Sequence, residues 1–256
     1  MRIFIGQKYR LDSNFNPYNT TLMLNLFMPQ IETALTPALF HLHSKNLNLK
    51  QVVVIDILRA TTTMVVAMEN GAKEIKAVAT LEDTLMLKNE GYLVAGERNG
   101  VKVEGFDFGN SPQEFDKHIV EGQKIALSTT NGTKAIEACK GAKFRYVSSF
   151  RNITAMLHKL IDNNCDVLLF CAGWKDKFNL EDTVFAGALI DQLLQHNFTT
   201  TDDASIMAQR LWLQAKSDLT AFLADASHVQ RFKSLHIESD LEVCLKFDTY
   251  TRVLDL

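Results

Sequence analysis

Apolar runs recur along the chain, and each is followed by a polar loop and then by a helical pattern. The runs occupy residues 52–57, 75–80, 92–97, 124–128, 144–149 and 166–173. They are almost continuously apolar and do not alternate with polar residues, which is typical of strands covered on both faces of a parallel sheet. Strands that alternate with helices predict an α/β protein, here a three-layer α/β/α fold with a mostly parallel sheet.

The helical patterns between the runs have recognisable ends. One helix is expected to end at Asn70-Gly71 and another before Gly91, since glycine favours a helix C-terminus. Further helices are expected near 133–140, after Asn152 as an N-cap, and near 181–195. Residues 202–236 form a long helical pattern without glycine or proline, and we interpret 242–247 as a returning strand.

The chain reads as one folded unit behind a short extension. Residues 1–28 are Asn-rich and irregular, so we expect the α/β unit to span 29–256. Two closely packed sub-domains, about 29–120 and 121–256, are the alternative. The strand–loop–helix segments at 52–63 and 124–133 look alike, which leaves an internal duplication open.

Composition excludes several classes of protein. A hydrophobic content of 46% with 12 glycines and 4 prolines excludes collagen-like and disordered chains. A net charge of −3 without a basic face argues against nucleic acid as a partner. The four cysteines lack zinc-ligand or disulfide spacing, so we expect a reducing, cytoplasmic location. No apolar stretch reaches the length of a spanning helix, so no membrane partner is expected; homo-oligomerisation stays open.

The glycines are distributed unevenly. Eight of the 12 lie within residues 91–141, mainly in the loops 96–115 and 128–133. Glycine lets backbone N–H groups approach a ligand closely, and a loop that enters a helix attracts anions. We therefore interpret these two loops as anion-binding segments, although a long connection and an ordinary helix cap would also explain them.

Polar side chains follow the apolar runs where each predicted strand ends. In open α/β sheets, ligands bind beyond the carboxyl ends of the strands. Carboxylates at these ends suit Mg²⁺, and we predict a metal site made by Asp56, Glu97, Glu181 and Asp182. The alternatives are structural, because Asp56 would also pair with Arg59, and acids are favoured at helix N-termini in general.

Arginines, hydroxyls and amides from the same ends suit phosphate oxygens. The predicted substrate-binding residues are Arg59, Arg98, Asn110, Ser111, Thr129, Thr130, Asn131, Gly132 and Thr133. We expect Asp56, Arg59 and Glu97 to be catalytic.

Two known phosphatase chemistries do not fit. An aspartyl-phosphate phosphatase of the haloacid dehalogenase type needs DxD, but Leu58 stands at the second Asp position. A cysteine phosphatase needs C-x5-R, but Lys177 stands six residues after Cys171, which we interpret as a buried core residue. Of the histidines, only His228 is kept as a candidate site residue, and Arg151 and Asn152 are interpreted as helix-capping residues.

Several segments together resemble the 2-phosphosulfolactate phosphatase family. They are VVVIDILRATTT, GERNG followed by GFDFGNSP, STTNGT, and CAG followed by NLEDTVFAG, in this order between about residues 52 and 189. Ser227-His228, Asp240 and Cys244 resemble the family's tail, although Val229 stands where the family has glycine and the final valine-proline stretch is missing. Residues 1–28 have no counterpart.

The resemblance implies a Mg²⁺-dependent acid phosphatase connected with coenzyme M synthesis. Its expected substrate is a small anionic phosphomonoester, 2-phosphosulfolactate, which is cleaved to sulfolactate and phosphate in a cleft of an α/β/α fold. Water is favoured as the attacking group, since the DxD signature is missing. An aspartyl-phosphate-type phosphatase for another phospho-hydroxy acid and a non-catalytic anion-binding metabolite sensor are the rival hypotheses.

Overall fold

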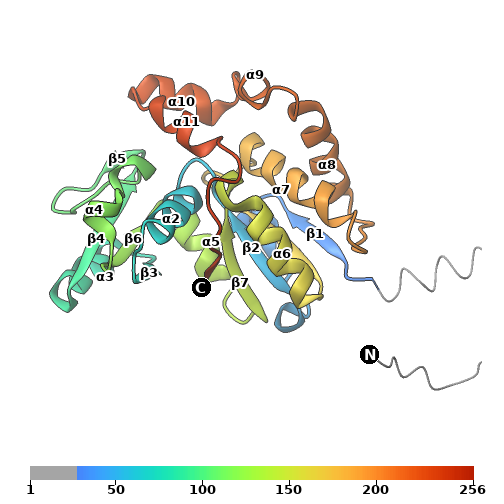
Figure 1. The fold of residues 1–256 in the computed structure, drawn as a ribbon, viewed down its shortest axis with the longest axis horizontal. Helices are drawn as coiled ribbons and strands as arrows, with labels where there is room; N and C mark the ends of the chain where they lie inside the picture. The colour runs from blue at the N-terminus through green and yellow to red at the C-terminus, as the bar shows by residue number, and fades with distance from the viewer. Residues whose placement is uncertain (1–27) are drawn as a thin grey trace, which may run out of the picture.

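The computed structural model describes residues 28–256 of the chain. The predicted extension, residues 1–28, therefore lies outside the described residues except for Met28. Two mostly parallel sheets form the framework (Figure 1), and the strands keep the order β1-β8-β2-β7-β9 in the larger sheet and β3-β6-β4-β5 in the smaller.

The larger sheet carries four parallel strands and one antiparallel edge. Strand β2 pairs in parallel with β8 on one side and β7 on the other, and β9 pairs antiparallel with β7. Its strands are β1 (Ile31–Ala34), β2 (Gln51–Ile55), β7 (Phe144–Ser148), β8 (Val167–Cys171) and β9 (Leu254–Asp255).

The smaller sheet has the same character. Strand β6 lies between β3 and β4 and is parallel to both, while β5 returns antiparallel to β4. Its strands are β3 (Glu74–Ala77), β4 (Tyr92–Arg98), β5 (Val101–Lys102) and β6 (Lys124–Ser128).

Helices α2 (Ala60–Glu69) and α5 (Gly132–Ala138) form a layer that both sheets share. Their apolar side chains lie in one buried cluster with Val52 and Val54 of the larger sheet and with Ile125 and Leu127 of the smaller. The intervening residues Val53 and Ile55 face the opposite side, toward α6 (Ile153–Asn163) and α7 (Leu180–Leu193). A near-continuous apolar strand is therefore buried on both faces, as its sequence predicts.

The remaining helices lie around this framework. Short elements on the smaller-sheet side are α3 (Leu81–Met86) and α4 (Lys117–Val120), and the C-terminal third supplies α8 (Asp203–Ala215), α9 (Leu219–Leu223), α10 (Ser227–Leu235) and α11 (Ser239–Cys244). The 3-10 turns are Pro37–Leu42, Leu47–Leu49, Leu87–Glu90, Pro112–Glu114 and Phe150–Asn152. Between residues 28 and 256, no helix is long and apolar enough to cross a membrane.

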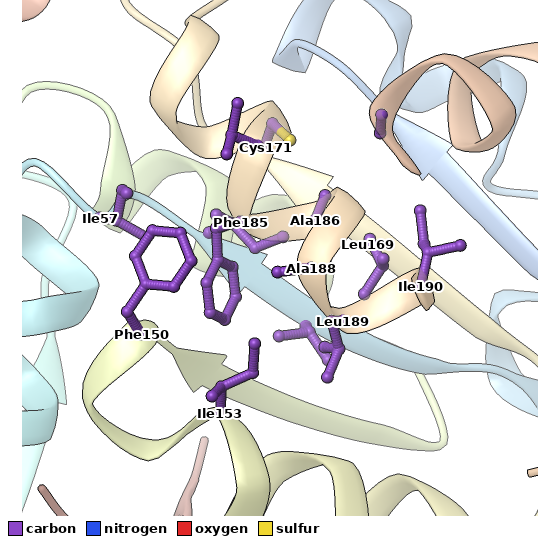
Figure 2. Close-up of a cluster of buried hydrophobic side chains, with 14 of the residues drawn as sticks. Ile57, Phe150, Ile153, Leu169, Cys171, Phe185, Ala186, Ala188, Leu189 and Ile190 are labelled. Atoms are coloured by element: carbon purple, nitrogen blue, oxygen red, sulfur yellow. The ribbon is translucent and has the colours of Figure 1, made fainter. Parts of the chain in front are cut away.

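Figure 2 shows the core on the α7 side of the larger sheet. The rings of Phe150 and Phe185 meet edge to face at a centroid distance of 5.1 Å, between Ile57 and Ile153. Cys171 is completely buried in this cluster, and burial raises the pKa of its thiol well above the usual value. Cys171 is therefore a core residue, as interpreted from the sequence.

The structure confirms the α/β class and the three layers around the larger sheet, and it corrects other expectations. The smaller sheet is a separate parallel sheet, which the sequence did not predict. Residues 242–247 are not a strand, because Leu241, Cys244 and Leu245 follow a helical spacing and pack on the core from α11. The predicted helical pattern over 202–236 consists of three helices.

The proposed divisions of the chain stay predictions. Both sheets draw strands from either side of residue 120, since β6 joins β3 and β4, while β7 and β8 join β2. The two similar strand–loop–helix segments lie in different sheets and give no evidence of a duplication.

The tightest helix contact predicts a sensitive position. A Cβ on Gly187 of α7 would lie 2.0 Å from the Ala208 carbonyl oxygen of α8. Gly187→Ala would force the helices apart and should lower the free energy of unfolding by about 1–3 kcal/mol, measured by urea denaturation. Gln192→Ala on the same helix is the control, with an expected change within about 0.5 kcal/mol. An unchanged midpoint for Gly187→Ala would contradict the close approach.

Candidate active site

The carboxyl ends of both sheets open into one cavity. It is lined by Asp56 after β2, Glu97 of β4, Thr129 after β6 and Trp174 after β8. Helix α10 covers it: a Cβ on Gly100, in the β4–β5 turn, would lie 2.6 Å from a methyl carbon of Leu235. Figure 1 shows α10 and α11 at the same end of the molecule as this turn. Parallel strands and a covering helix thus bring polar residues from distant segments to one place.

Asp56 is the buried acid of this cavity. Its backbone N–H donates to Thr61 Oγ1 at 3.1 Å, and its carbonyl accepts from the Thr61 N–H at 2.9 Å, which fixes the strand-to-helix turn. Burial raises the pKa of Asp56 to about 6; the nearby His228 opposes this rise, and Glu97 and Glu181 add to it. A carboxylate desolvated among other acids is a good place for a cation or a proton.

Helix α5 approaches Asp56 very closely. A Cβ on Gly132 would lie 2.8 Å from Asp56 Oδ2 and 2.7 Å from the Ala60 Cβ. Only glycine leaves room for this contact, so the sequence signal at Gly132 is explained by packing against the acid.

Glu97 holds two loops around the cavity. Its Oε1 accepts from the backbone N–H and the hydroxyl of Thr130, both at 2.8 Å, and its Oε2 accepts from the Gly100 N–H at 2.6 Å. Each carboxylate oxygen offers about two acceptor positions, so Oε2 keeps capacity for a further partner.

Glu181 and Asp182 are adjacent in the sequence but have different hydrogen-bond partners. Glu181 Oε1 is 2.7 Å from His228 Nδ1, and both side chains are largely buried. Asp182 accepts from the backbone N–H groups of Ile57 at 3.0 Å and Gly173 at 3.2 Å. It therefore joins the ends of β2 and β8. Burial and the charges of Glu181 and Asp56 raise its pKa well above the usual value.

Arg59 lines the cavity and forms an ion pair with Asp240, which does not line it. Its Nη1 donates to Asp240 Oδ2, and both residues are buried. Asp240 Oδ1 accepts from the Ser111 hydroxyl at 2.6 Å and from Gln113 Nε2 at 2.8 Å. The guanidinium is thus held in place while its other N–H groups remain for a ligand. Ser111 acts behind Arg59 and does not line the cavity.

Some hydrogen-bond donors of the loop 128–133 bind within the loop, and others have no acceptor among the described residues. Thr129 and Thr133 bind each other, through Thr133 N–H to Thr129 Oγ1 at 3.2 Å and Thr133 Oγ1 to the Thr129 carbonyl at 3.0 Å. Within the described residues, the N–H groups of Asn131 and Gly132 donate to no protein acceptor. Two amide donors beside the cavity therefore remain for a ligand.

Most, but not all, of the predicted site residues line this cavity. Those that do are Asp56, Arg59, Glu97, Asn110, Thr129, Thr130 and Asn131. Arg98 turns away, because its Nη1 donates to the Glu97 carbonyl at 2.7 Å and its Nη2 to Ser128 Oγ at 3.1 Å. Arg98 as a substrate ligand and Asp182 as a metal ligand stay predictions, and this geometry gives them other partners.

Trp174 and Arg231 are among the cavity residues that sequence reasoning missed, and His228 was kept only as a candidate. The Arg231 guanidinium carbon lies 4.5 Å from the centre of the Trp174 ring. No strand-end pattern marks Arg231, since it lies on α10, whose only sequence signal was the tail segment around His228. Arg151 and Asn152 have partners within the fold: Arg151 Nη1 donates to the Val243 carbonyl at 3.2 Å, and Asn152, at the N-cap position of α6, completes a capping box with Ser149 at the preceding 3-10 turn.

The oxygen atoms that line the cavity are suitable ligands for Mg²⁺. Residues 28–256 contain no cluster of three or more His, Cys, Asp or Glu side chains that could hold a metal by themselves. However, the buried Oδ1 of Asn110 lacks a hydrogen-bond partner among these residues, and Asn110 lines the cavity with Asp56 and Glu97. Mg²⁺ usually takes one or two carboxylates and completes its shell with water and substrate phosphate, so this oxygen-rich set fits it.

Comparison with known proteins decides the family. The family model for 2-phosphosulpholactate phosphatase matches residues 35–256. A probable 2-phosphosulfolactate phosphatase of Thermotoga petrophila is 39% identical over 201 residues, which are 78% of this chain and 86% of that protein. A protein of the same name in Clostridium novyi is 34% identical over 202 residues, again 78% and 86% of the two chains. A third, in Caldicellulosiruptor saccharolyticus, is 38% identical over 205 residues, 77% and 84%.

The chain belongs to the 2-phosphosulfolactate phosphatase family. The resemblance of the strand-end segments is thereby confirmed, and the match extends through the tail that carries α10 and α11. In this member of the family, the tail lines the cavity through His228 and Arg231 and anchors Arg59 through Asp240. The protein is a member of a family of phosphoric monoester hydrolases.

The raised pKa of Asp56 predicts that the charged form of this acid lowers the free energy of unfolding at neutral pH. Because the folded-state pKa of about 6 exceeds the usual 3.8, the folded protein favours the protonated acid, and stability falls as pH rises from about 4 through 6. Asp56→Asn removes the buried charge, so its Tm should exceed that of the wild type at pH 7 by a few degrees, and the difference should fade toward pH 4. Asp225→Asn, at an exposed position, is the control for a lost surface charge. A lower Tm for Asp56→Asn at pH 7 would contradict this account.

Proposed function

We propose that the protein is a Mg²⁺-dependent phosphatase that hydrolyses the phosphate ester of a small 2-hydroxy acid, 2-phosphosulfolactate, to sulfolactate and phosphate. One observation carries the proposal: buried Asp56 shares its cavity with Arg59 and with the loop 128–133, whose Asn131 and Gly132 N–H groups have no acceptor among residues 28–256. Acids and anion donors in one cavity suit a phosphate that arrives with a divalent cation. Membership of the family and the names of the relatives support the same reaction.

The phosphoryl group would lie against the loop 128–133. The N–H groups of Asn131 and Gly132 and the free N–H groups of Arg59 are the donors for its oxygens. Arg59 keeps its position because Asp240 neutralises it and holds it from behind. Fixed donors aimed at the phosphoryl oxygens stabilise the charge that accumulates as the P–O bond breaks.

Mg²⁺ would be held by Asp56 and Glu97, with the Asn110 carbonyl oxygen as a further candidate ligand. Bound there, the ion neutralises negative charge on the phosphoryl oxygens. Glu181 and Asp182 contribute charge near Asp56. Asp182 keeps its bonds to the two strand ends.

His228 is the general acid of this proposal, and Glu181 positions it. With Nδ1 bonded to Glu181 at 2.7 Å, the second ring nitrogen is the one left for the substrate. Water attacks phosphorus, the bond from phosphorus to the ester oxygen breaks, and His228 gives its proton to that oxygen, which leaves as the hydroxyl of sulfolactate. Inorganic phosphate carries the oxygen and one proton of the water, and the other proton of the water returns through solvent to His228.

The reaction is tested by phosphate release. Purified protein should release phosphate from 2-phosphosulfolactate with Mg²⁺ and lose this activity in EDTA, and Asp56→Asn should lower kcat by at least about 10³-fold, as expected for loss of a site carboxylate. Asp225→Asn should match the wild type. Binding of 2-phosphosulfolactate without turnover under any metal condition would instead identify a metabolite sensor.

Calorimetric titration with Mg²⁺ tests metal binding without turnover. Because the protein supplies only one or two carboxylates, calorimetry should show weak Mg²⁺ binding alone and tighter binding when inorganic phosphate is present. Equal Mg²⁺ affinity with and without phosphate would contradict a shell completed by the phosphate.

The role of His228 predicts a dependence on the leaving group. His228→Gln should lower kcat on 2-phospholactate by about 10²–10⁴-fold, because the departing alkoxide then lacks a proton donor. The loss should be much smaller on phosphoenolpyruvate, which has the same phosphate and carboxylate but a better leaving group. Glu181→Gln should show the same pattern more weakly. An equal loss on both substrates would show that His228 is not the general acid.

A further inference from the structure

The cavity holds a second arginine that has no acidic partner. Arg231 makes no ion pair with any described residue, whereas Arg59 is paired with Asp240. Arg231 lines the cavity and is only partly exposed, with its guanidinium 4.5 Å from the centre of the Trp174 ring. An aromatic face holds a guanidinium in a fixed plane and leaves its N–H edge available for a bidentate oxyanion.

The position of Arg231 on α10 relates it to the leaving group. His228 and Arg231 are three residues apart on this helix, so their side chains lie on one face, about 5–6 Å apart at Cβ. The phosphoryl donors come from a wall made by other elements, the turns that follow β2 and β6. A substrate whose phosphate meets that wall and whose ester oxygen meets His228 therefore turns its remaining substituents toward Arg231.

The residues around Arg231 do not neutralise its charge. Phe232 and Leu235 lie on the same helix and line the cavity, but they offer no charge to neutralise Arg231. The nearby acids do not neutralise Arg231: Glu97 binds two loops, Glu181 binds His228, and Asp56, which lines the cavity, forms no ion pair with Arg231 among the described residues. Arg231 is thus left as a cation that an anionic ligand can neutralise.

We propose that Arg231, held by Trp174, binds the second anionic group of the substrate, a carboxylate or sulfonate on the carbon skeleton of the leaving group. This inference rests on the proposed phosphatase function and deepens it, since it names the residue that selects phosphate esters of acidic alcohols over simple alkyl phosphates.

Three substrates separate the possible anions. 2-Phospholactate carries only the carboxylate, 1-sulfopropan-2-yl phosphate carries only the sulfonate, and isopropyl phosphate carries neither. Arg231→Gln should raise KM about 10- to 100-fold on the substrate whose anion it binds, the loss expected for a hydrogen-bonded ion pair, and change kcat little. Its kcat/KM on isopropyl phosphate should stay within about threefold of the wild type, and Arg231→Lys should restore part of the affinity.

Arg210→Gln is the matched control, because it removes an exposed arginine from α8. It should match the wild type on all three substrates. The inference is overturned if Arg231→Gln loses the same factor on isopropyl phosphate as on the acidic substrates, which indicates a structural role, or if it loses nothing on either acidic substrate.

A binding measurement makes the inference independent of turnover. Calorimetric titration with sulfolactate, which keeps both non-phosphate anions, should show affinity that Arg231→Gln lowers and Arg210→Gln preserves. If the wild type hydrolyses no phosphate ester but shows this binding difference, the proposed function fails and the inference about Arg231 stands. If hydrolysis occurs and the two variants bind sulfolactate equally, the inference fails alone.

Discussion

The site depends on how closely α5 approaches the end of β2. The contact between Gly132 and Asp56 leaves no room for a Cβ, and it joins a loop of the smaller sheet to an acid of the larger. Because α2 and α5 pack against both sheets, the carboxyl ends of the two sheets are fixed relative to each other at this point. Glu97 of the smaller sheet joins the same arrangement, because it accepts from the backbone N–H and the hydroxyl of Thr130 in the loop before α5.

Two acids are buried near this contact, and burial disfavours their charged forms. Asp182 shows the structural use of a buried carboxyl group, since it joins the ends of β2 and β8 through two backbone N–H groups. For Asp56, burial raises the pKa to about 6 and outweighs a hydrogen bond with the backbone of Ala60, which lowers the pKa. Folding holds this acid in a place where it is disfavoured, and a bound cation would relieve that penalty.

The C-terminal tail completes the site from the other side. Asp240 of α11 binds Arg59, Ser111 and Gln113, so one carboxylate links the tail to the first strand–helix turn and to the loop after β5. Helix α10 then places His228 and Arg231 over the cavity. In the reaction proposed above, the sheet ends bind the phosphoryl group and the tail binds the leaving group.

The sequence by itself determined the α/β class, the strands β2, β3, β4, β6, β7 and β8, and most of the cavity residues at strand ends, but not the short strands β1, β5 and β9. These follow from local patterns, since apolar runs buried on both faces and polar loops after them are properties of short segments. Only the tertiary structure decided that the strands form two sheets, that Arg98 turns toward Ser128, that Asp182 joins two strands, and that Arg231 and Trp174 face the cavity. Each of these outcomes depends on which distant segments become neighbours. A polar side chain takes the partner that packing brings within reach, and no spacing along the chain specifies that partner.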